Sequence, residues 1–157
     1  MTIEIIEGSL FDATTKYIAH QTNCMSKRSA HLAATMFAQF PYADVYTNRK
    51  MPDVPGTICI RGNGQDQRFV INMFGQVYPG SPKFPDSTLD GSRARVKYFF
   101  KCLKAIHDME DLESIAFPYK VGCGAAGGDW TKYLNLLEKF ATAVGDRAQV
   151  LIYKLPE

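Results

Sequence analysis

Segments with strand periodicity alternate along this chain with segments of helical periodicity, and this alternation strongly constrains the fold. Apolar, β-branched or aromatic runs predict six strands, at Ile3–Ile6, Tyr17–Gln21, Thr57–Arg61, Phe69–Phe74, Ser114–Pro118 and Gln149–Leu155. Apolar residues at helical spacing predict three helices, at Ser29–Phe40, Arg93–Asp108 and Trp130–Val144. The resulting order β-β-α-β-β-α-β-α-β favours an α/β layered domain with a mixed sheet and helices on both faces.

The connections between these segments indicate where a ligand would bind. Gly62-Asn63-Gly64 predicts a hairpin, and the late β-α-β unit predicts parallel pairing at the C-terminal end. The proline- and glycine-rich stretch 78–91 is best interpreted as a long surface loop. In such sheets ligands sit outside the carboxyl ends of the strands. Two segments occupy that position, one after His20 and one after Pro118.

Composition excludes several classes of protein. With 157 residues, 46% of them apolar and 22% charged, the chain is expected to form a single domain over residues 1–157. The net charge of +2 is spread along the chain, so a dedicated nucleic-acid surface is not expected. No membrane span or signal peptide is expected either. The scattered cysteines lack metal-ligand spacing, so we expect a reduced cytoplasmic protein (or a nuclear one) without metal or cofactor; they are Cys24, Cys59, Cys102 and Cys123.

One of the two candidate segments is a run of small residues at positions 121–128, here called the glycine loop. It contains four glycines and two alanines between a predicted strand and a predicted helix. Backbone amides in such a loop can approach a ligand closely, and the following helix start favours an anion. Phosphate binding is one interpretation, and a turn that only allows tight helix–sheet packing is the other. The spacing fits neither the P-loop nor the dinucleotide fingerprint.

Two residues of this region carry alternatives of their own. Asp129 precedes the predicted helix, where an aspartate caps free amides, although a carboxylate there could also polarise water or hold a ribose hydroxyl. Cys123 lies near the helix start and could be reactive, but no base neighbours it, which favours a packing or ligand-wall role.

The other candidate segment is the strand end Ile18-Ala19-His20-Gln21-Thr22-Asn23-Cys24. Asn and Gln side chains present both donors and acceptors, which suits recognition of hydroxyl and phosphate groups. His20 could donate or accept a proton, or could be a buried, hydrogen-bonded histidine. His31 and His107 are expected to be surface or cap residues.

Four segments taken in order resemble the macrodomain family. They are IEGSLF at 6–11, AHQTN at 19–23, FPYKVGCGAAGGDW at 117–130 and LIYKL at 151–155. The resemblance runs from Ile3 to Leu155. The chain looks most like the branch that contains terminal ADP-ribose protein glycohydrolase and the yeast-type ADP-ribose 1''-phosphate phosphatase.

The resemblance implies a three-layer α/β/α macrodomain with a central mixed, largely parallel six-stranded sheet and ADP-ribose along its crest. Asn23 would contact the distal ribose, the glycine loop would wrap the diphosphate, and Tyr153 and Leu155 would flank the adenine. The ADP-ribose-binding residues expected on this basis are Ser9, Leu10, Gln21, Asn23, Ser29, Ala30, Leu32, Gly122, Cys123, Gly124, Ala125, Ala126, Gly127, Tyr153 and Leu155.

Three departures from the family pattern limit what is carried over. Gly8-Ser9 stands where many macrodomains read Gly-Asp, and the first loop, residues 27–32, is not glycine-rich. The glycohydrolase type uses a lysine after the fourth strand and an aspartate in the glycine loop. Here that strand ends in Phe74-Gly75-Gln76-Val77, and Ala126 replaces the aspartate. A lysyl-adduct mechanism is therefore not expected.

The leading functional hypothesis is hydrolysis of ADP-ribose 1''-phosphate to ADP-ribose and phosphate. His20 would be the catalytic acid or base, and Asp129 or a ligand phosphate would position water. A second hypothesis is a de-ADP-ribosylating hydrolase that acts on a modified macromolecule or on O-acetyl-ADP-ribose. The third is a non-catalytic ADP-ribose-binding module. In each case the partner is ADP-ribose or a derivative, with ADP-ribosylated macromolecules as further candidates.

Overall fold

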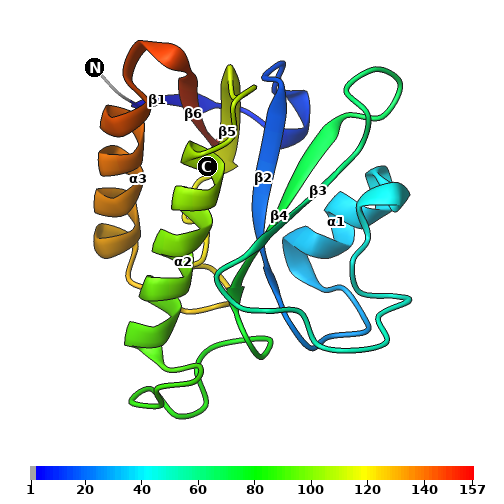
Figure 1. The fold of residues 1–157 in the computed structure, drawn as a ribbon, viewed down its shortest axis with the longest axis vertical. Helices are drawn as coiled ribbons and strands as arrows, with labels where there is room; N and C mark the ends of the chain where they lie inside the picture. The colour runs from blue at the N-terminus through cyan, green and yellow to red at the C-terminus, as the bar shows by residue number, and fades with distance from the viewer. Residues whose placement is uncertain (1–2) are drawn as a thin grey trace.

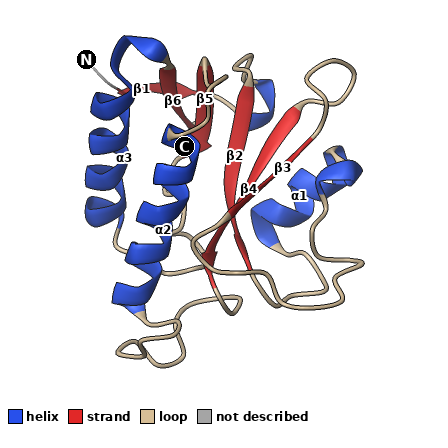
Figure 2. Cartoon of the chain, viewed as in Figure 1, coloured by secondary structure: helices blue, strands red, loops and turns tan. Residues whose placement is uncertain are grey.

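A six-stranded sheet forms the centre of the computed structural model, which describes residues 3–157 (Figure 2). In sheet order the strands are β1 (Ile3–Glu7), β6 (Gln149–Lys154), β5 (Ser114–Pro118), β2 (Tyr17–Asn23), β4 (Phe69–Gln76) and β3 (Ile58–Arg61). All neighbouring strands pair in parallel except β3 and β4, which form the expected antiparallel hairpin. The carboxyl ends of β2, β4 and β5 therefore meet at one edge of the sheet.

Helices cover both faces of this sheet. The helices α2 (Ser92–His107) and α3 (Trp130–Val144) pack on one face, and α1 (His31–Gln39) packs on the other (Figure 1). Three short 3-10 helices, η1 (Leu10–Asp12), η2 (Pro41–Ala43) and η3 (Gly145–Arg147), complete the connections. The predicted three-layer α/β/α arrangement with a mixed, largely parallel sheet is confirmed.

The buried side chains of β2 point alternately toward the two helical layers. Tyr17 and Ala19 join the cluster under α2 and α3, whereas Ile18 joins the cluster under α1. Successive side chains of a strand point to opposite faces. His20 follows the parity of Ile18, and its ring packs edge-on against Phe37 of α1 at 5.5 Å between ring centroids. The period of the strand thus directs His20 into a packed layer.

Element boundaries differ from the predicted ones by one or two residues, except for β5 and α3, which agree. The helix predicted from Ser29 begins at His31, because Ala30 has an extended backbone with φ −144° and ψ 162°. It ends before Pro41, which starts η2. The strand β2 continues past the predicted end at Gln21 to Asn23, with an irregular register between Thr22 and Asn23.

Candidate functional site

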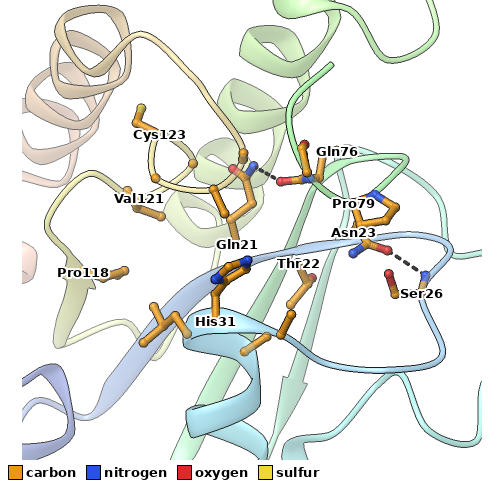
Figure 3. Close-up of a pocket in the computed structure, with 18 of the residues that line it drawn as sticks. Gln21, Thr22, Asn23, Ser26, His31, Gln76, Pro79, Pro118, Val121 and Cys123 are labelled. Atoms are coloured by element: carbon orange, nitrogen blue, oxygen red, sulfur yellow. Dashed lines mark hydrogen bonds between the residues drawn. The ribbon is translucent and has the colours of Figure 1, made fainter. Parts of the chain in front are cut away.

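A cavity of about 380 Å³ lies at the carboxyl ends of β2, β4 and β5, between the glycine loop and the start of α1 (Figure 3). This is the position expected for a ligand in a parallel sheet. Its walls combine the β2 strand end, the segment before and at the start of α1, the end of β4 with the loop after it, and the segment from Pro118 into the glycine loop. The lining residues are Gln21, Thr22, Asn23, Ser26, Arg28, Ala30, His31, Leu32, Ala33, Tyr46, Gln76, Pro79, Gly80, Pro118, Tyr119, Lys120, Val121, Gly122, Cys123, Gly124, Ala125 and Ala126.

The glycine loop presents unpaired backbone amides to this cavity. The amides of Cys123, Gly127 and Gly128 donate to carbonyls within the turn, at 2.8, 3.0 and 3.2 Å. Four further amides on the cavity wall have no acceptor among residues 3–157, namely those of Gly122, Gly124, Ala125 and Ala126. Neighbouring amides without protein acceptors favour an anionic ligand, which can accept from several of them at once.

The start of α1 adds a second group of available amides. A helix leaves its first N–H groups without intrahelical acceptors, and a polar N-cap side chain usually binds one of them. Here the N-cap is Ala30, which has no side-chain oxygen, and His31, Leu32 and Ala33 all line the cavity. The helix dipole also favours a negative charge at this end. A ligand anion could therefore complete the cap.

Charged side chains on the cavity wall agree with this preference. Arg28 and Lys120 line it, and within the described part of the chain neither an Asp nor a Glu does. A cavity with cations and amide donors but no carboxylate attracts phosphate and repels metal cations. The structure also contains no group of three or more His, Cys, Asp or Glu residues arranged to hold a metal among residues 3–157.

Two glutamine side chains, Gln21 of β2 and Gln76 of β4, meet at the wall of the cavity. Gln21 Nε2 donates to Gln76 Oε1 at 2.7 Å (Figure 3). Gln76 Nε2 donates in turn to the Tyr78 carbonyl at 2.8 Å. Gln76 stands at the end of β4. It thus acts as a neutral hydrogen-bonding residue that ties β2 to the loop after β4.

Asn23 shapes the loop that follows β2. Its Oδ1 accepts from the amides of Met25 and Ser26 at 3.0 and 2.7 Å, and its Nδ2 donates to the Tyr46 hydroxyl at 3.2 Å. Asn23 is buried, yet it lines the cavity. These hydrogen bonds fix the conformation of residues 23–26 at one edge of the cavity.

Arg49 holds the loop after β2, residues 23–26, and it was not predicted from the sequence. Its guanidinium donates to the carbonyls of Asn23 and Ser26 at 3.0 Å each, pairs with Asp53 at 2.8 Å, and lies 5.0 Å from the Tyr46 ring centroid. The side chain is only 4% exposed. Arg49 lies 23 residues from Ser26 in sequence, so no local pattern could predict the contact.

A buried ion pair, Asp90 with Arg95, supports the opposite side of the cavity and was also missed. Asp90 accepts from the amides of Val77 and Tyr78 at 2.7 and 3.1 Å. Arg95 pairs with Asp90 at 2.7 Å and donates to the carbonyls of Gly80 and Ala126 at 2.7 and 3.3 Å. Since Gly80 and Ala126 both line the cavity, this pair joins the loop after β4 to the glycine loop.

His20, the residue predicted to be the catalytic acid or base, lies outside the cavity. Its side chain is fully buried, and its Nε2 donates to Asn72 Oδ1 at 2.7 Å, because the Asn72 amide nitrogen faces the carbonyls of Ala43 and Cys59. The other ring nitrogen, Nδ1, has no partner among residues 3–157. Burial lowers the pKa of His20 to about 4, although the hydrogen bond with Asn72 opposes this. A neutral, enclosed imidazole does not suit proton transfer to a ligand, which favours the buried interpretation over the catalytic one.

Asp129 also lies away from the cavity. Its carboxylate accepts from the Thr131 amide at 3.0 Å and caps α3, in agreement with the capping interpretation. It lines a separate cavity of about 480 Å³ between the starts of α2 and α3. Gly127, expected to bind ADP-ribose, lines that second cavity instead of the first.

The remaining expected contacts divide into two groups. Those on the cavity wall, beyond Gln21 and Asn23, are Ala30, Leu32, Gly122, Cys123, Gly124, Ala125 and Ala126. Those that do not line it, beyond Gly127, are Ser9, Leu10, Ser29, Tyr153 and Leu155. Ser9 caps η1 by accepting from the Phe11 amide at 3.2 Å, and Leu10 is a core residue. Tyr153 stays near the cavity, since its carbonyl accepts from the Tyr119 amide at 2.9 Å.

Comparisons with known proteins identify the fold. No family model matches the chain, and none of the curated proteins matches its sequence. Among solved structures, the macrodomain of Thermus aquaticus DarG superposes with a TM-score of 0.71 and 19% identity, over 96% of this chain and 97% of that chain. The macrodomain of Mycobacterium tuberculosis DarG gives 0.72 and 19% over the same shares. A Trypanosoma brucei macrodomain in complex with ADP-ribose gives 0.67 and 15%, over 98% of this chain and 63% of that chain. The chain therefore has the macrodomain fold.

The described helices do not include a membrane-spanning candidate. Among residues 3–157 no helix combines the length and the apolar character needed to cross a bilayer. The longest of them, α2, has 16 residues, and its exposed positions include Arg93, Lys97, Lys101 and Lys104.

Proposed function

We propose that this chain, whose fold is that of a macrodomain, binds ADP-ribose or a derivative in the cavity between the glycine loop and α1. The observation that carries the proposal is the chemistry of the cavity wall. It offers unpaired amides from two segments and cations at Arg28 and Lys120, without a carboxylate among the described residues. A diphosphate satisfies several such donors at once. The volume of about 380 Å³ is in the usual range for small-molecule sites.

In this proposal the diphosphate lies between the glycine loop and the start of α1. The distal ribose lies toward Asn23 and Gln76, whose side chains form the polar end of the cavity. The adenine lies toward Tyr119, and beyond it toward the ends of β1 and β6, where Ser9, Leu10, Tyr153 and Leu155 are found. The bound ligand in the Trypanosoma brucei macrodomain supports ADP-ribose as the ligand to test.

The cavity supports binding better than hydrolysis. Burial raises the pKa of the Cys123 thiol to about 12 and that of the Tyr46 hydroxyl to about 12, so both stay protonated near neutral pH. Neither is an activated nucleophile. With His20 in the core and Asp129 capping α3, the two groups expected to perform the hydrolysis of ADP-ribose 1''-phosphate do not face the cavity.

The phosphatase hypothesis is tested by phosphate release. We expect incubation of the protein with ADP-ribose 1''-phosphate to release phosphate no faster than the same solution without protein. Turnover that disappears in His20→Gln while ADP-ribose still binds would restore the catalytic role of His20.

The binding proposal is tested by placing a carboxylate at the start of α1. In Ala30→Asp the new side chain caps the helix amides and brings a negative charge into the cavity, so it competes with a ligand phosphate. Loss of a charge-assisted hydrogen bond of about 1.5–3 kcal/mol predicts an ADP-ribose Kd raised at least about tenfold by calorimetry. The same cap predicts an unfolding free energy higher by about 1 kcal/mol.

The matched control is Ala38→Asp, which adds the same charge to an exposed position near the other end of α1. We expect this variant to bind ADP-ribose as the wild type does. The proposal is wrong if the wild type shows no saturable binding at millimolar ADP-ribose, or if Ala30→Asp binds as tightly as Ala38→Asp.

A further inference from the structure

Two side chains of the cavity wall are held on a backbone that ordinary residues avoid. Among residues 3–157, His31 with φ 54° and Lys120 with φ 60° are the non-glycine residues of positive φ, and both line the cavity. This left-handed region places Cβ close to the carbonyl oxygen and is disfavoured for L-residues. Strained backbone of this kind gathers at ligand sites when the side chain is needed there.

The fold itself makes no visible use of the His31 side chain. His31 is the first residue of α1, it is exposed, and neither ring nitrogen has a hydrogen-bond partner in the described chain. Figure 3 shows its imidazole projecting from the start of α1 toward Gln21, within the cavity. A glycine at this position would relieve the backbone without removing a contact from the core.

Lys120 repeats the pattern on the β5 side of the cavity. It is the third residue of a turn closed by the Val121 amide and the Pro118 carbonyl at 3.1 Å. Turns with positive φ at the third position ordinarily carry glycine or asparagine there. The chain thus has a lysine and a histidine where glycine would be less strained, both beside the unpaired amides.

We propose that His31 is a ligand-contacting residue that recognises phosphate, its imidazole N–H donating to a phosphate oxygen held by the glycine loop and the start of α1. The inference rests on the proposed function and deepens it. Because Arg28, Lys120 and the free amides surround the same space, the group that His31 meets is an anion. His31 therefore makes the cavity select ligands with a diphosphate over a nucleoside with the same base and ribose.

The test measures affinity and stability together. In His31→Gly we expect the ADP-ribose Kd to rise about tenfold or more, as for the loss of one hydrogen bond to a charged group, while the thermal midpoint stays at or above the wild-type value. His31→Asn keeps a residue that tolerates the left-handed backbone and removes the ring, so we expect the same weakening. His107→Ala removes a partly exposed histidine outside the cavity, and it should leave the Kd unchanged.

The outcomes separate this inference from the proposal beneath it. If the wild type binds ADP-ribose and His31→Gly binds it equally tightly, the role of His31 is overturned and the proposed function stands. Weakening in His31→Gly but not in His31→Asn would assign the loss to backbone flexibility and would also overturn it. Lack of ADP-ribose binding by the wild type would overturn the proposed function and this inference together.

Discussion

The ion pair between Asp90 and Arg95 allows a prediction whose size follows from the structure. The Arg95 side chain is 3% exposed and that of Asp90 is 9% exposed, so both charges are buried. Arg95 meets Asp90 through two nitrogens, at 2.7 and 3.1 Å, and donates to backbone carbonyls of two separate loops. Arg95→Met removes the positive charge and leaves the carboxylate of Asp90 buried without its cation.

Removal of one partner from a buried pair costs about 3–5 kcal/mol, because the remaining charge is uncompensated. A domain of ordinary stability has an unfolding free energy of about 5–15 kcal/mol. We therefore expect Arg95→Met to fold at low temperature, with a urea midpoint much lower than that of the wild type. The double variant Asp90→Leu with Arg95→Met should recover part of this loss, because no unpaired charge remains.

Ligand binding should not recover with stability. Both variants lose the donors to the carbonyls of Gly80 and Ala126, which hold the two loops beside the cavity. We therefore expect calorimetry to show weaker ADP-ribose binding in the double variant even where it is fully folded. Stability and affinity would then report two separate roles of one ion pair.

The matched control is Lys104→Met, which breaks an exposed pair with Asp108 of the same helical region. The side chains of Lys104 and Asp108 are 64% and 55% exposed, and exposed ion pairs contribute little to the free energy of unfolding. We expect no measurable change in the urea midpoint for this control. If Arg95→Met lowered the unfolding free energy by less than about 1 kcal/mol, burial of the pair would not have the predicted effect.

Two further predictions concern His20 and the glycine loop. His20 has a pKa of about 4 in the folded chain against an ordinary 6.5, so the unfolded chain binds more protons between these values. The unfolding free energy should therefore fall as pH drops from 6.5 toward 4, by up to roughly 3 kcal/mol, and urea titrations of His20→Gln should lack this part of the slope. In Gly122→Ala a new Cβ would lie 2.6 Å from the Tyr133 ring and 2.8 Å from Gln21 Oε1 on a backbone of φ 77°. Calorimetric melting should show a clear destabilisation there, but none in Gly124→Ala, where no described atom lies within 4 Å; equal melting of the two variants would contradict the geometry.

The order of elements and the place of the site could be predicted from the sequence, because both depend on local patterns. Period-2 runs and helical stripes gave six strands and three helices, and the strand-end rule located the cavity beside Gln21 and the glycine loop. The residues Ala30, Leu32 and Asn23, which the resemblance singled out, line this cavity.

The misplaced residues have a common physical cause, since their role depends on direction and long-range contact. His20 and Gln21 are adjacent in sequence, yet the alternation of β2 sends His20 into the layer under α1. Only the register of β2 on β4, which pairs His20 with Asn72, shows that the imidazole already has a structural partner. The strand parity of Ile18 could have raised this objection from the sequence.

The supporting ion pairs and the strained residues were beyond sequence reasoning for a different reason. Arg49 and Arg95 act on carbonyls 15 to 31 residues away, and no periodicity encodes such contacts. His31 and Lys120 line the cavity with a left-handed backbone, which nothing in their residue type predicts. Both kinds of feature become visible only when loops are placed in space.

The most direct measurement of the central claim is a crystal structure of this chain grown or soaked with ADP-ribose. We expect density for one molecule in the cavity, with the diphosphate oxygens within hydrogen-bond distance of the amides of Gly124, Ala125 or Ala126 and of the first turn of α1. We also expect His20 to stay enclosed, away from the ligand. An empty cavity at saturating ligand, or ADP-ribose bound elsewhere on the molecule, would contradict the proposed binding site.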